Sequence, residues 1–265
     1  DAFMEPVTWF LTGMEKHSDE SREELLGNAD NFVASISHHM SNMLTPSLQV
    51  AMNELSNHDH SRFLTRTNHM VGRVEHLGPK AANNYVNLGV MREAVVMQMT
   101  WVGAPTVYYG DEAGVCGFTD PDNRRTYPWG HEDKELIAFH REMIRIHKEH
   151  PALRTGSLNM LYWDENILAY GRFLEEDKVI VIINNRSELA QVTVPVWQAE
   201  IPMKCRMKKL MYSYLDGYST NYDEFLVEDG EVVVNMGAHS ALVLSMRDMD
   251  KQTCPNQNES NEKSL

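Results

Sequence analysis

The feature that most constrains the fold of this chain is a change of pattern near Gly156. Before this residue, strand-like and helix-like stretches alternate, and after it only short strand-like stretches follow one another. Alternating strands and helices are typical of a parallel sheet covered by helices, whereas a series of short alternating strands predicts an antiparallel sandwich. We therefore expect an α/β half followed by an all-β half.

Apolar spacing and β-branched runs locate the expected elements of the first half. We expect strands at residues 2–4, 48–55 and 106–109, and helices at residues 23–43, 83–101 and 134–149. For the first of these helices, Ser21 is a candidate N-cap and Glu24 completes a capping box with it. This order predicts about three strands of a barrel-like sheet.

The second half consists of short strands separated by polar turns. We expect strands at residues 158–163, 167–173, 179–183, 192–196, 209–214, 231–234 and 240–244. Residues 250–265 are rich in Asn, Glu and Ser and are expected to form a disordered tail. The expected domains are thus a barrel portion at 1–150, a β-sandwich at 151–249 and the tail.

The charge and cysteine content restrict the class of partner. Acidic residues outnumber basic ones by 38 to 24, for a net charge of −14, so the chain should repel nucleic acid. No apolar run has the length of a membrane span, so no membrane partner is expected. The three cysteines, an odd number without CxxC spacing, favour a reducing compartment and a cytoplasmic location. Because the chain begins at Asp1, we expect its true N-terminus upstream, where a signal peptide would escape detection.

The run Asn57-His58-Asp59-His60 follows the apolar stretch 48–55, where an α/β barrel carries functional side chains. Two other interpretations remain open for this run. The His-Asp pair is also compatible with a simple turn or cap. His58 and His60 are also compatible with a metal pair, although the sequence offers no third ligand at a matching spacing.

A second cluster of polar and aromatic residues extends over residues 103–114 and 120–129. It contains adjacent carboxylates, two arginines at 124 and 125, and the pair Pro128-Trp129. Planar charged groups and aromatic rings together are typical of a site for polyols. The alternative is a loop whose Asp and Arg side chains hold only each other.

These segments together resemble the α-amylase family, glycoside hydrolase family 13. Asn57-His58-Asp59 resembles the family's fourth conserved region, and residues 103–114 resemble the end of its eighth barrel strand. Residues 120–125, Pro128-Trp129 and Arg62-Phe63-Leu64-Thr65 are similar to the neopullulanase, cyclomaltodextrinase and maltogenic amylase branch. The resemblance implies the C-terminal part of a (β/α)8 TIM barrel followed by an antiparallel β-sandwich.

The resemblance also implies roles for four residues. Asp59 matches the third catalytic carboxylate, which stabilises the transition state and is neither the nucleophile nor the acid. His58 matches a histidine that binds the sugar in the cleavage subsite. Asp120 and Arg124 match a pair that contacts the next sugar on the non-reducing side. The segment 108–112 is expected to shape the loop.

Retaining glycoside hydrolysis also needs a nucleophile and an acid/base carboxyl group. The family's GxRxD-type and GE-type motifs for these groups are absent from residues 1–265. We therefore interpret the chain as a C-terminal fragment, inactive alone, of an enzyme acting on α-glucosidic bonds of malto-oligosaccharides, cyclodextrins, pullulan or starch. The alternative is a non-catalytic carbohydrate-binding protein or a degenerate amylase-like protein. No cofactor is expected, and a calcium site outside this chain and the oligomeric state stay open.

Overall fold

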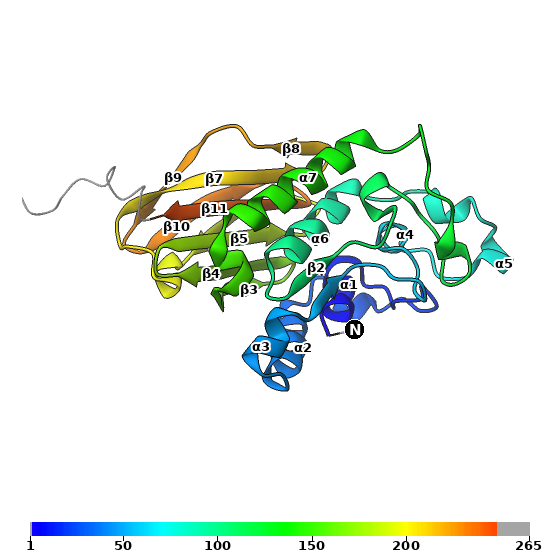
Figure 1. The fold of residues 1–265 in the computed structure, drawn as a ribbon, viewed down its shortest axis with the longest axis horizontal. Helices are drawn as coiled ribbons and strands as arrows, with labels where there is room; N and C mark the ends of the chain where they lie inside the picture. The colour runs from blue at the N-terminus through cyan, green and yellow to red at the C-terminus, as the bar shows by residue number, and fades with distance from the viewer. Residues whose placement is uncertain (1, 248–265) are drawn as a thin grey trace, which may run out of the picture.

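The computed structural model describes residues 2–247 of the chain. Figure 1 shows helices and loops of the first part packed beside a large sheet formed by the second part. The sheet begins at Ser157, so the change of pattern predicted near Gly156 is confirmed. The predicted tail at residues 250–265 lies outside the described residues.

The first part is built mainly of short helices, with two short strands. Its elements are α1 Met4–Thr12, η1 Glu23–Leu25, α2 Ala29–Ser41, α3 Thr45–Gln49, β1 Met52–Glu54, α4 Phe63–Arg66, α5 Val74–Leu77, η2 Ala81–Asn83, α6 Leu88–Thr100, β2 Ala104–Thr106, η3 Asp111–Ala113, η4 Asp122–Arg124, α7 Lys134–Glu149 and α8 Pro151–Thr155. The helix predicted at 134–149 is confirmed as α7. The helix predicted at 83–101 is α6, which begins later because the Asn87 side chain caps its N-terminus.

The strand predicted at residues 2–4 is wrong, because this segment leads into helix α1. Phe3, Val7 and Phe10 are all buried and lie three or four positions apart, which is the spacing of one helix face. An apolar run of three residues is too short to reveal that period. Pro6 lies in the first turn, where its missing N–H breaks no hydrogen bond within the helix.

The helix predicted at residues 23–43 is shorter than expected and starts at a different cap. A short 3-10 turn is followed by Gly27 in the left-handed region, with φ 67°, and this residue separates η1 from α2. The cap of α2 is Asn28, whose side chain accepts a hydrogen bond from the backbone N–H three residues later. The capping box expected from Ser21 and Glu24 is therefore wrong.

Strands β1 and β2 pair in parallel, with Met52 opposite Ala104. They overlap the strands predicted at 48–55 and 106–109, but the predicted bounds are wrong: helix α3 includes residues 48 and 49, and β2 ends at Thr106. The described residues contribute two strands of a barrel-like sheet where three were expected. The chain passes closely over β1 at Gly103, where an added Cβ atom would lie 2.6 Å from the Asn53 Oδ1 atom. Only glycine fits this position, which also has φ 132°.

The second part is one nine-stranded sheet in which all neighbouring strands pair antiparallel. Its strands are β3 Ser157–Asp164, β4 Ile167–Leu174, β5 Asp177–Asn184, β6 Ala190–Val194, β7 Cys205–Tyr214, β8 Gly217–Ser219, β9 Glu224–Glu228, β10 Glu231–Met236 and β11 Ser240–Arg247, with the short helix η5 Val196–Ala199 between β6 and β7. The order is β3-β4-β5-β11-β7-β9-β10-β6, and β8 pairs with β7. The antiparallel prediction is confirmed, although the sequence pattern does not reveal β8 and β9.

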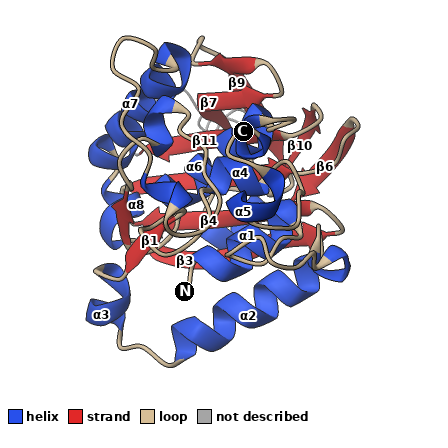
Figure 2. Ribbon diagram, turned by 90° about the vertical axis from the view of Figure 1, so that its right-hand side faces the viewer, coloured by secondary structure: helices blue, strands red, loops and turns tan. Residues whose placement is uncertain are grey.

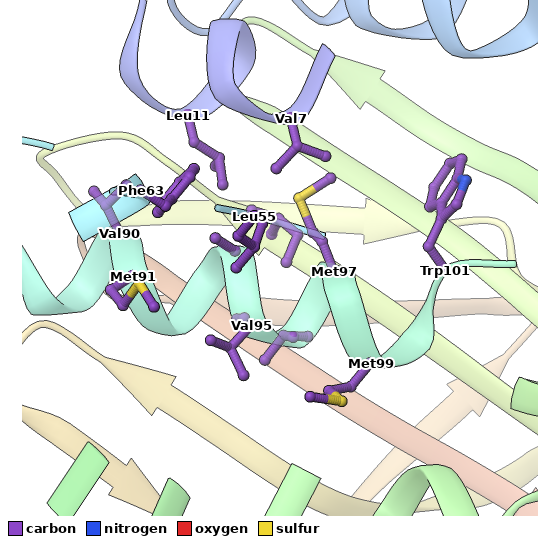
Figure 3. Close-up of a cluster of buried hydrophobic side chains, with 14 of the residues drawn as sticks. Val7, Leu11, Leu55, Phe63, Val90, Met91, Val95, Met97, Met99 and Trp101 are labelled. Atoms are coloured by element: carbon purple, nitrogen blue, oxygen red, sulfur yellow. The ribbon is translucent and has the colours of Figure 1, made fainter. Parts of the chain in front are cut away.

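Both faces of the central strands are buried. On one face, β4, β5 and β11 pack against side chains of β6, β9 and β10, so that the two ends of the same sheet enclose a core. On the other face, β11 contacts helix α6 of the first part, and β4 and β5 contact helix α8. Apolar residues of α6 and of these strands form one cluster, part of which Figure 3 shows. This second cluster, the shared core, includes Val90, Met97, Trp101, Tyr170, Val181 and Val243.

Candidate active site

The side chain of Asn57 fixes the backbone of the turn that follows β1. The Asn57 Oδ1 atom accepts hydrogen bonds from the backbone N–H groups of Asp59, at 2.9 Å, and His60, at 3.1 Å. The Asn57 amide nitrogen donates to Glu54 at 2.7 Å. This local turn exposes the next two side chains, of which His58 is 65% and Asp59 60% accessible.

The segment 119–124 lies directly against this turn. Thr119 Oγ1 donates to the Asp59 carbonyl at 2.7 Å, and Arg124 Nε donates to the His58 carbonyl at 3.2 Å. The Arg124 guanidinium also pairs with the Asp120 carboxylate at 2.6 Å. The structure therefore brings together the four site residues predicted from the sequence, and all four side chains are about half exposed or more.

Asn123 is a site residue that the sequence reasoning missed. It is fully buried, and its amide nitrogen donates to the carbonyls of Asn57, at 3.1 Å, and His60, at 2.6 Å. These two bonds join the loop that carries Asp120 and Arg124 to the turn that carries His58 and Asp59. A single polar residue within a charged run gives no local signal of such a distant contact.

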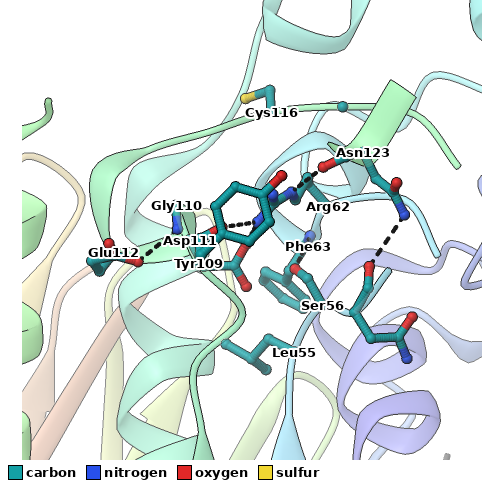
Figure 4. Close-up of polar contacts among 12 residues, drawn as sticks. Leu55, Ser56, Arg62, Phe63, Tyr109, Gly110, Asp111, Glu112, Cys116 and Asn123 are labelled. Carbon is teal, nitrogen blue, oxygen red and sulfur yellow. Dashed lines mark hydrogen bonds and ion pairs between the residues drawn. The ribbon is translucent and has the colours of Figure 1, made fainter. Parts of the chain in front are cut away.

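Arg62 joins the loop 119–124 to the segment 108–112, as Figure 4 shows. Its fully buried guanidinium donates to the carbonyls of Asn123 and Tyr109 and forms an ion pair with Asp111 at 2.9 Å. It also lies over the Tyr108 ring, 4.0 Å from the centroid. Burial raises the pKa of the Asp111 carboxyl, and the positive charge of Arg62 opposes this shift. Asp111 therefore has the structural role expected for the segment 108–112.

His60 points away from the exposed face. Its side chain is buried, and burial, followed by the charge of Arg66, lowers its pKa to about 4, so the ring is neutral near pH 7. The ring packs edge to face on His17, which hydrogen-bonds Thr119 at 2.7 Å. His60 is buried and His58 exposed, which does not favour their interpretation as a metal pair. Within residues 2–247, no three His, Cys, Asp or Glu side chains gather in a metal-binding arrangement.

The geometry of this site fits recognition of a polyhydroxylated molecule. The Asp59 and Asp120 carboxylates accept hydrogen bonds, the Arg124 guanidinium donates them, and the His58 imidazole does either according to its tautomer. The side chains of Asn57, Thr119 and Asn123 fix the backbone of the two loops, so these four side chains lie on one surface. They lie at the carboxyl end of β1, where barrel enzymes carry their functional groups.

Comparisons with known proteins identify relatives of the chain. The sequence profile of the alpha amylase catalytic domain matches residues 12–166. An amylopullulanase from Thermoanaerobacter thermohydrosulfuricus is 31% identical over 209 residues, which cover 75% of this chain and 13% of that protein. Neopullulanase 2 from Thermoactinomyces vulgaris is 34% identical over 177 residues, covering 64% and 27%. The crystal structure of a debranching enzyme from Nostoc punctiforme matches with a TM-score of 0.68 and 22% identity, over 92% of this chain and 46% of that one.

The profile match extends over more than half of the chain and includes the turn at residues 57–60 and the loop 119–124. It confirms the resemblance drawn from these segments, and the similarity to a neopullulanase agrees with the branch named above. The chain spans less than a third of the length of these curated relatives. Among the helices of residues 2–247, none combines the length and apolar character that crossing a membrane requires.

Proposed function

Because this chain belongs to the α-amylase family, we propose that it forms part of a retaining glycoside hydrolase acting on α-glucosidic bonds of malto-oligosaccharides, cyclodextrins, pullulan or starch. The observation that best supports this proposal is the convergence of His58, Asp59, Asp120 and Arg124 on one exposed surface. Under the proposal, the nucleophile and the acid/base group are provided from outside residues 1–265.

We assign Asp59 the role of transition-state stabiliser. Its carboxylate is exposed while its backbone is held by Asn57 and Thr119, so the charge is positioned before the sugar arrives. When the glycosidic bond breaks, the sugar ring acquires positive charge. Hydrogen bonds from the sugar hydroxyls to this carboxylate then strengthen, and the barrier falls. The nearby His58 binds the same sugar unit through a further hydroxyl.

We assign Asp120 and Arg124 to the adjoining sugar. The two side chains form an ion pair at 2.6 Å, with one partner accepting and the other donating hydrogen bonds. Neighbouring hydroxyls of a glucose unit offer the complementary donor and acceptor. This role affects the binding of longer substrates more than the chemical step.

The test is a substrate screen with the full-length protein, using maltotriose, a cyclodextrin, pullulan and soluble starch. We expect hydrolysis of at least one of these α-glucans with retention of the anomeric configuration. No activity on any of them, together with hydrolysis of another class of substrate, would refute the proposal. The 265-residue chain alone is expected to be inactive.

A second candidate is a carbohydrate-binding protein without catalysis. The observation in its favour is that no GxRxD-type or GE-type motif occurs in residues 1–265. The coding sequence upstream of Asp1 separates the two proposals. An open frame with both motifs supports the enzyme, whereas a start codon close to Asp1 supports the binding protein.

We further propose that these residues bind no cofactor and that the reaction takes place in the cytoplasm. The thiol of Cys116 is free and buried, which fits a reducing compartment. The partner of the site is an α-glucan oligosaccharide, a neutral molecule that a chain with a net charge of −14 does not repel.

A further inference from the structure

Three aromatic side chains with accessible rings lie at the border of the candidate active site. Tyr109 is 42% and Trp129 79% exposed, and Tyr127 is partly exposed. We call these three residues the aromatic strip. They are distinct from the four residues assigned to the two sugar units, and rings exposed to this extent contribute little to the core.

Tyr109 connects the strip to the site. It follows β2, whose carboxyl end lies beside that of β1, because the two strands are parallel neighbours. The Tyr109 carbonyl accepts a hydrogen bond from Arg62 at 2.6 Å, and the same guanidinium donates to the Asn123 carbonyl at 2.9 Å. Tyr109 is therefore separated by one side chain from the loop that carries Arg124.

Two contacts join Tyr127 and its neighbours to the segment that contains Tyr109. The Tyr109 hydroxyl donates to the Arg125 carbonyl at 2.8 Å. Desolvation, followed by the charge of the Glu112 carboxylate and a hydrogen bond to it, raises the pKa of the Tyr127 hydroxyl. Glu112 in turn accepts a hydrogen bond from the backbone N–H of Gly110 at 2.9 Å. The rings of the strip thus belong to two segments that are bonded to each other.

Arg125 attaches the same loop to a third segment. Its guanidinium donates to the Asn83 side chain at 2.7 Å and to the Pro79 carbonyl at 2.6 Å, and it pairs with Asp122 at 2.7 Å. Asn83 and Pro79 follow helix α5, which lies at the end of the molecule that faces the viewer in Figure 2. These contacts hold the loop in place at the surface.

A tight turn presents the Trp129 ring to solvent. The His131 N–H donates to the Pro128 carbonyl at 2.8 Å, and Gly130 has φ 81°, the positive value that a type II turn requires at its third residue. Trp129 occupies the second position of this turn. Its ring packs on that of Tyr127, with centroids 4.5 Å apart. The ring is thus supported on one side and accessible on the other.

We propose that the aromatic strip binds further glucose units of a linear α-glucan, beyond the two sugars at the candidate active site, so that the enzyme favours longer chains. This inference rests on the proposed function. The strip adjoins the site and combines aromatic faces with hydroxyl and carboxylate groups. A glucose unit has matching features, because its ring carbons form an apolar face and its edge carries hydroxyls.

The size and charge of the strip favour a sugar over other partners. A specific protein interface covers roughly 800 Å² on each partner, which is more than three partly covered rings offer. A glucan chain needs only one ring face for each sugar that it adds. Because the glucan is neutral, the net charge of −14 does not repel it.

Calorimetric titration of the 265-residue chain with maltoheptaose and with maltotriose tests the proposal. Neither sugar is expected to be hydrolysed, because the chain lacks the nucleophile and acid/base motifs. We expect maltoheptaose to bind about three- to tenfold more tightly, the range for an added aromatic contact. Trp129→Ala should remove most of this difference, whereas Trp129→Tyr, which keeps a ring, should retain part of it.

The matched control is Trp197→Ala. It removes another exposed tryptophan, 53% accessible, from helix η5, which packs against β3, β4 and β10. Both affinities should stay unchanged. The proposal fails if the two sugars bind equally well, or if Trp129→Ala binds maltoheptaose as tightly as the unchanged chain does. It also fails if Trp197→Ala causes the same loss as Trp129→Ala.

Kinetics of the full-length protein separate this inference from the proposed function. Trp129→Ala should lower kcat/KM for maltoheptaose about three- to tenfold more than for maltotriose, and mainly through KM, because the strip contacts sugars away from the bond that breaks. An equal loss for both sugars would overturn the inference. If the unchanged protein hydrolyses neither sugar nor any other α-glucan, the proposed function fails, and the binding experiment still decides whether the strip holds a glucan.

Discussion

At the scale of single residues, the candidate active site contains buried or half-buried side chains that fix the backbone and exposed side chains that are free to bind a ligand. Asn57, Thr119 and Asn123 donate to or accept from the backbone of the two loops and so fix their shape. Asp59 and Arg124 project from the same backbone into solvent. Substitutions of the first group are expected to affect folding, and substitutions of the second group to affect function.

Asp59→Asn tests the catalytic role directly. The turn depends on the Asn57 side chain and on the Asp59 backbone, so the substitution should leave the melting temperature nearly unchanged. It removes the negative charge that strengthens hydrogen bonds in the transition state, and kcat should fall by about 10²-fold or more. The measurement is kcat and melting temperature in the full-length protein. A kcat close to that of the unchanged enzyme would assign Asp59 to the turn alone.

Arg124→Ala and Asp120→Ala test the neighbouring subsite. Each removes charge-assisted hydrogen bonds worth about 1.5 to 3 kcal/mol, so kcat/KM for oligosaccharides should fall about ten- to a hundredfold. Short activated glycosides that do not reach this subsite provide the control and should lose much less. Equal losses for both kinds of substrate would show that the pair only maintains the loop.

The sequence predicts the exposed residues of this site better than the buried ones. His58 and Asp59 follow a strand within a short motif, and such a motif is readable locally. His17 contributes by a hydrogen bond to Thr119, and Asn123 by a hydrogen bond to the turn after β1. In both cases the two partners are far apart in the sequence. No periodicity or spacing encodes such contacts, and only the folded chain reveals them.

At the scale of elements, one buried ion pair connects the loop after β2 to helix α4. Arg62→Met leaves Asp111 buried without its cation, which should lower the free energy of unfolding by about 3 to 5 kcal/mol. The exposed pair of Arg73 and Asp19 gives a matched control, and Arg73→Met should cost at most about 1 kcal/mol. Urea denaturation of the 265-residue chain measures both. Similar losses in the two variants would show that burial adds nothing to the Arg62 pair.

Helix α6 carries a buried acid that makes stability depend on pH. Glu93 is fully buried, and neither carboxyl oxygen has a hydrogen-bond partner among the described residues. Burial raises its pKa well above the usual 4.5. The stability that the protonated form provides is therefore complete below pH 4.5, and it is lost as the pH rises toward the pKa of the folded state.

Unfolding curves over a range of pH measure this effect. Relative to Glu93→Gln, the unchanged chain should lose up to about 1.4 kcal/mol for each pH unit above 4.5, until the folded carboxyl ionises. The control is Glu176→Gln, at an exposed position between β4 and β5, which should follow the unchanged chain. Parallel curves for the unchanged chain and Glu93→Gln would show that Glu93 is ionised in the folded state.

Elements with a long, regular pattern are predictable from this sequence, whereas short ones are not. Helix α7 has sixteen residues, with Asp133 as cap and Pro151 just beyond its end, and the prediction of its two ends is confirmed. The three residues at 2–4 fit a strand or the start of a helix equally well. Burial against α2 and α6 decides for the helix, and that choice depends on the packing of distant segments.

At the scale of the whole molecule, the two parts are joined by the shared core. Met97 of α6 and Trp101, which follows the last residue of this helix, lie in one apolar cluster with Tyr170 and Val181 of the sheet. The Trp101 and Tyr170 rings pack edge to face, with centroids 4.8 Å apart. The sheet has a second core on its other face, but the first part has no comparable cluster apart from the shared one among the described residues. The two parts should therefore differ in how far each folds alone.

Expression of residues 1–150 and 151–265 as separate chains tests this difference. Residues 1–150 lose the sheet that covers α6, so we expect an insoluble or molten product without a cooperative melt. Residues 151–265 keep the core between β4, β5, β11 and the far strands, but they expose the face that carries Tyr170 and Val181. This chain should fold, bind a hydrophobic dye and melt at a lower temperature than the intact chain. If residues 151–265 form a monomer that binds no dye and melts at the temperature of the intact chain, the shared core contributes little to stability. The sheet would then be stable without α6.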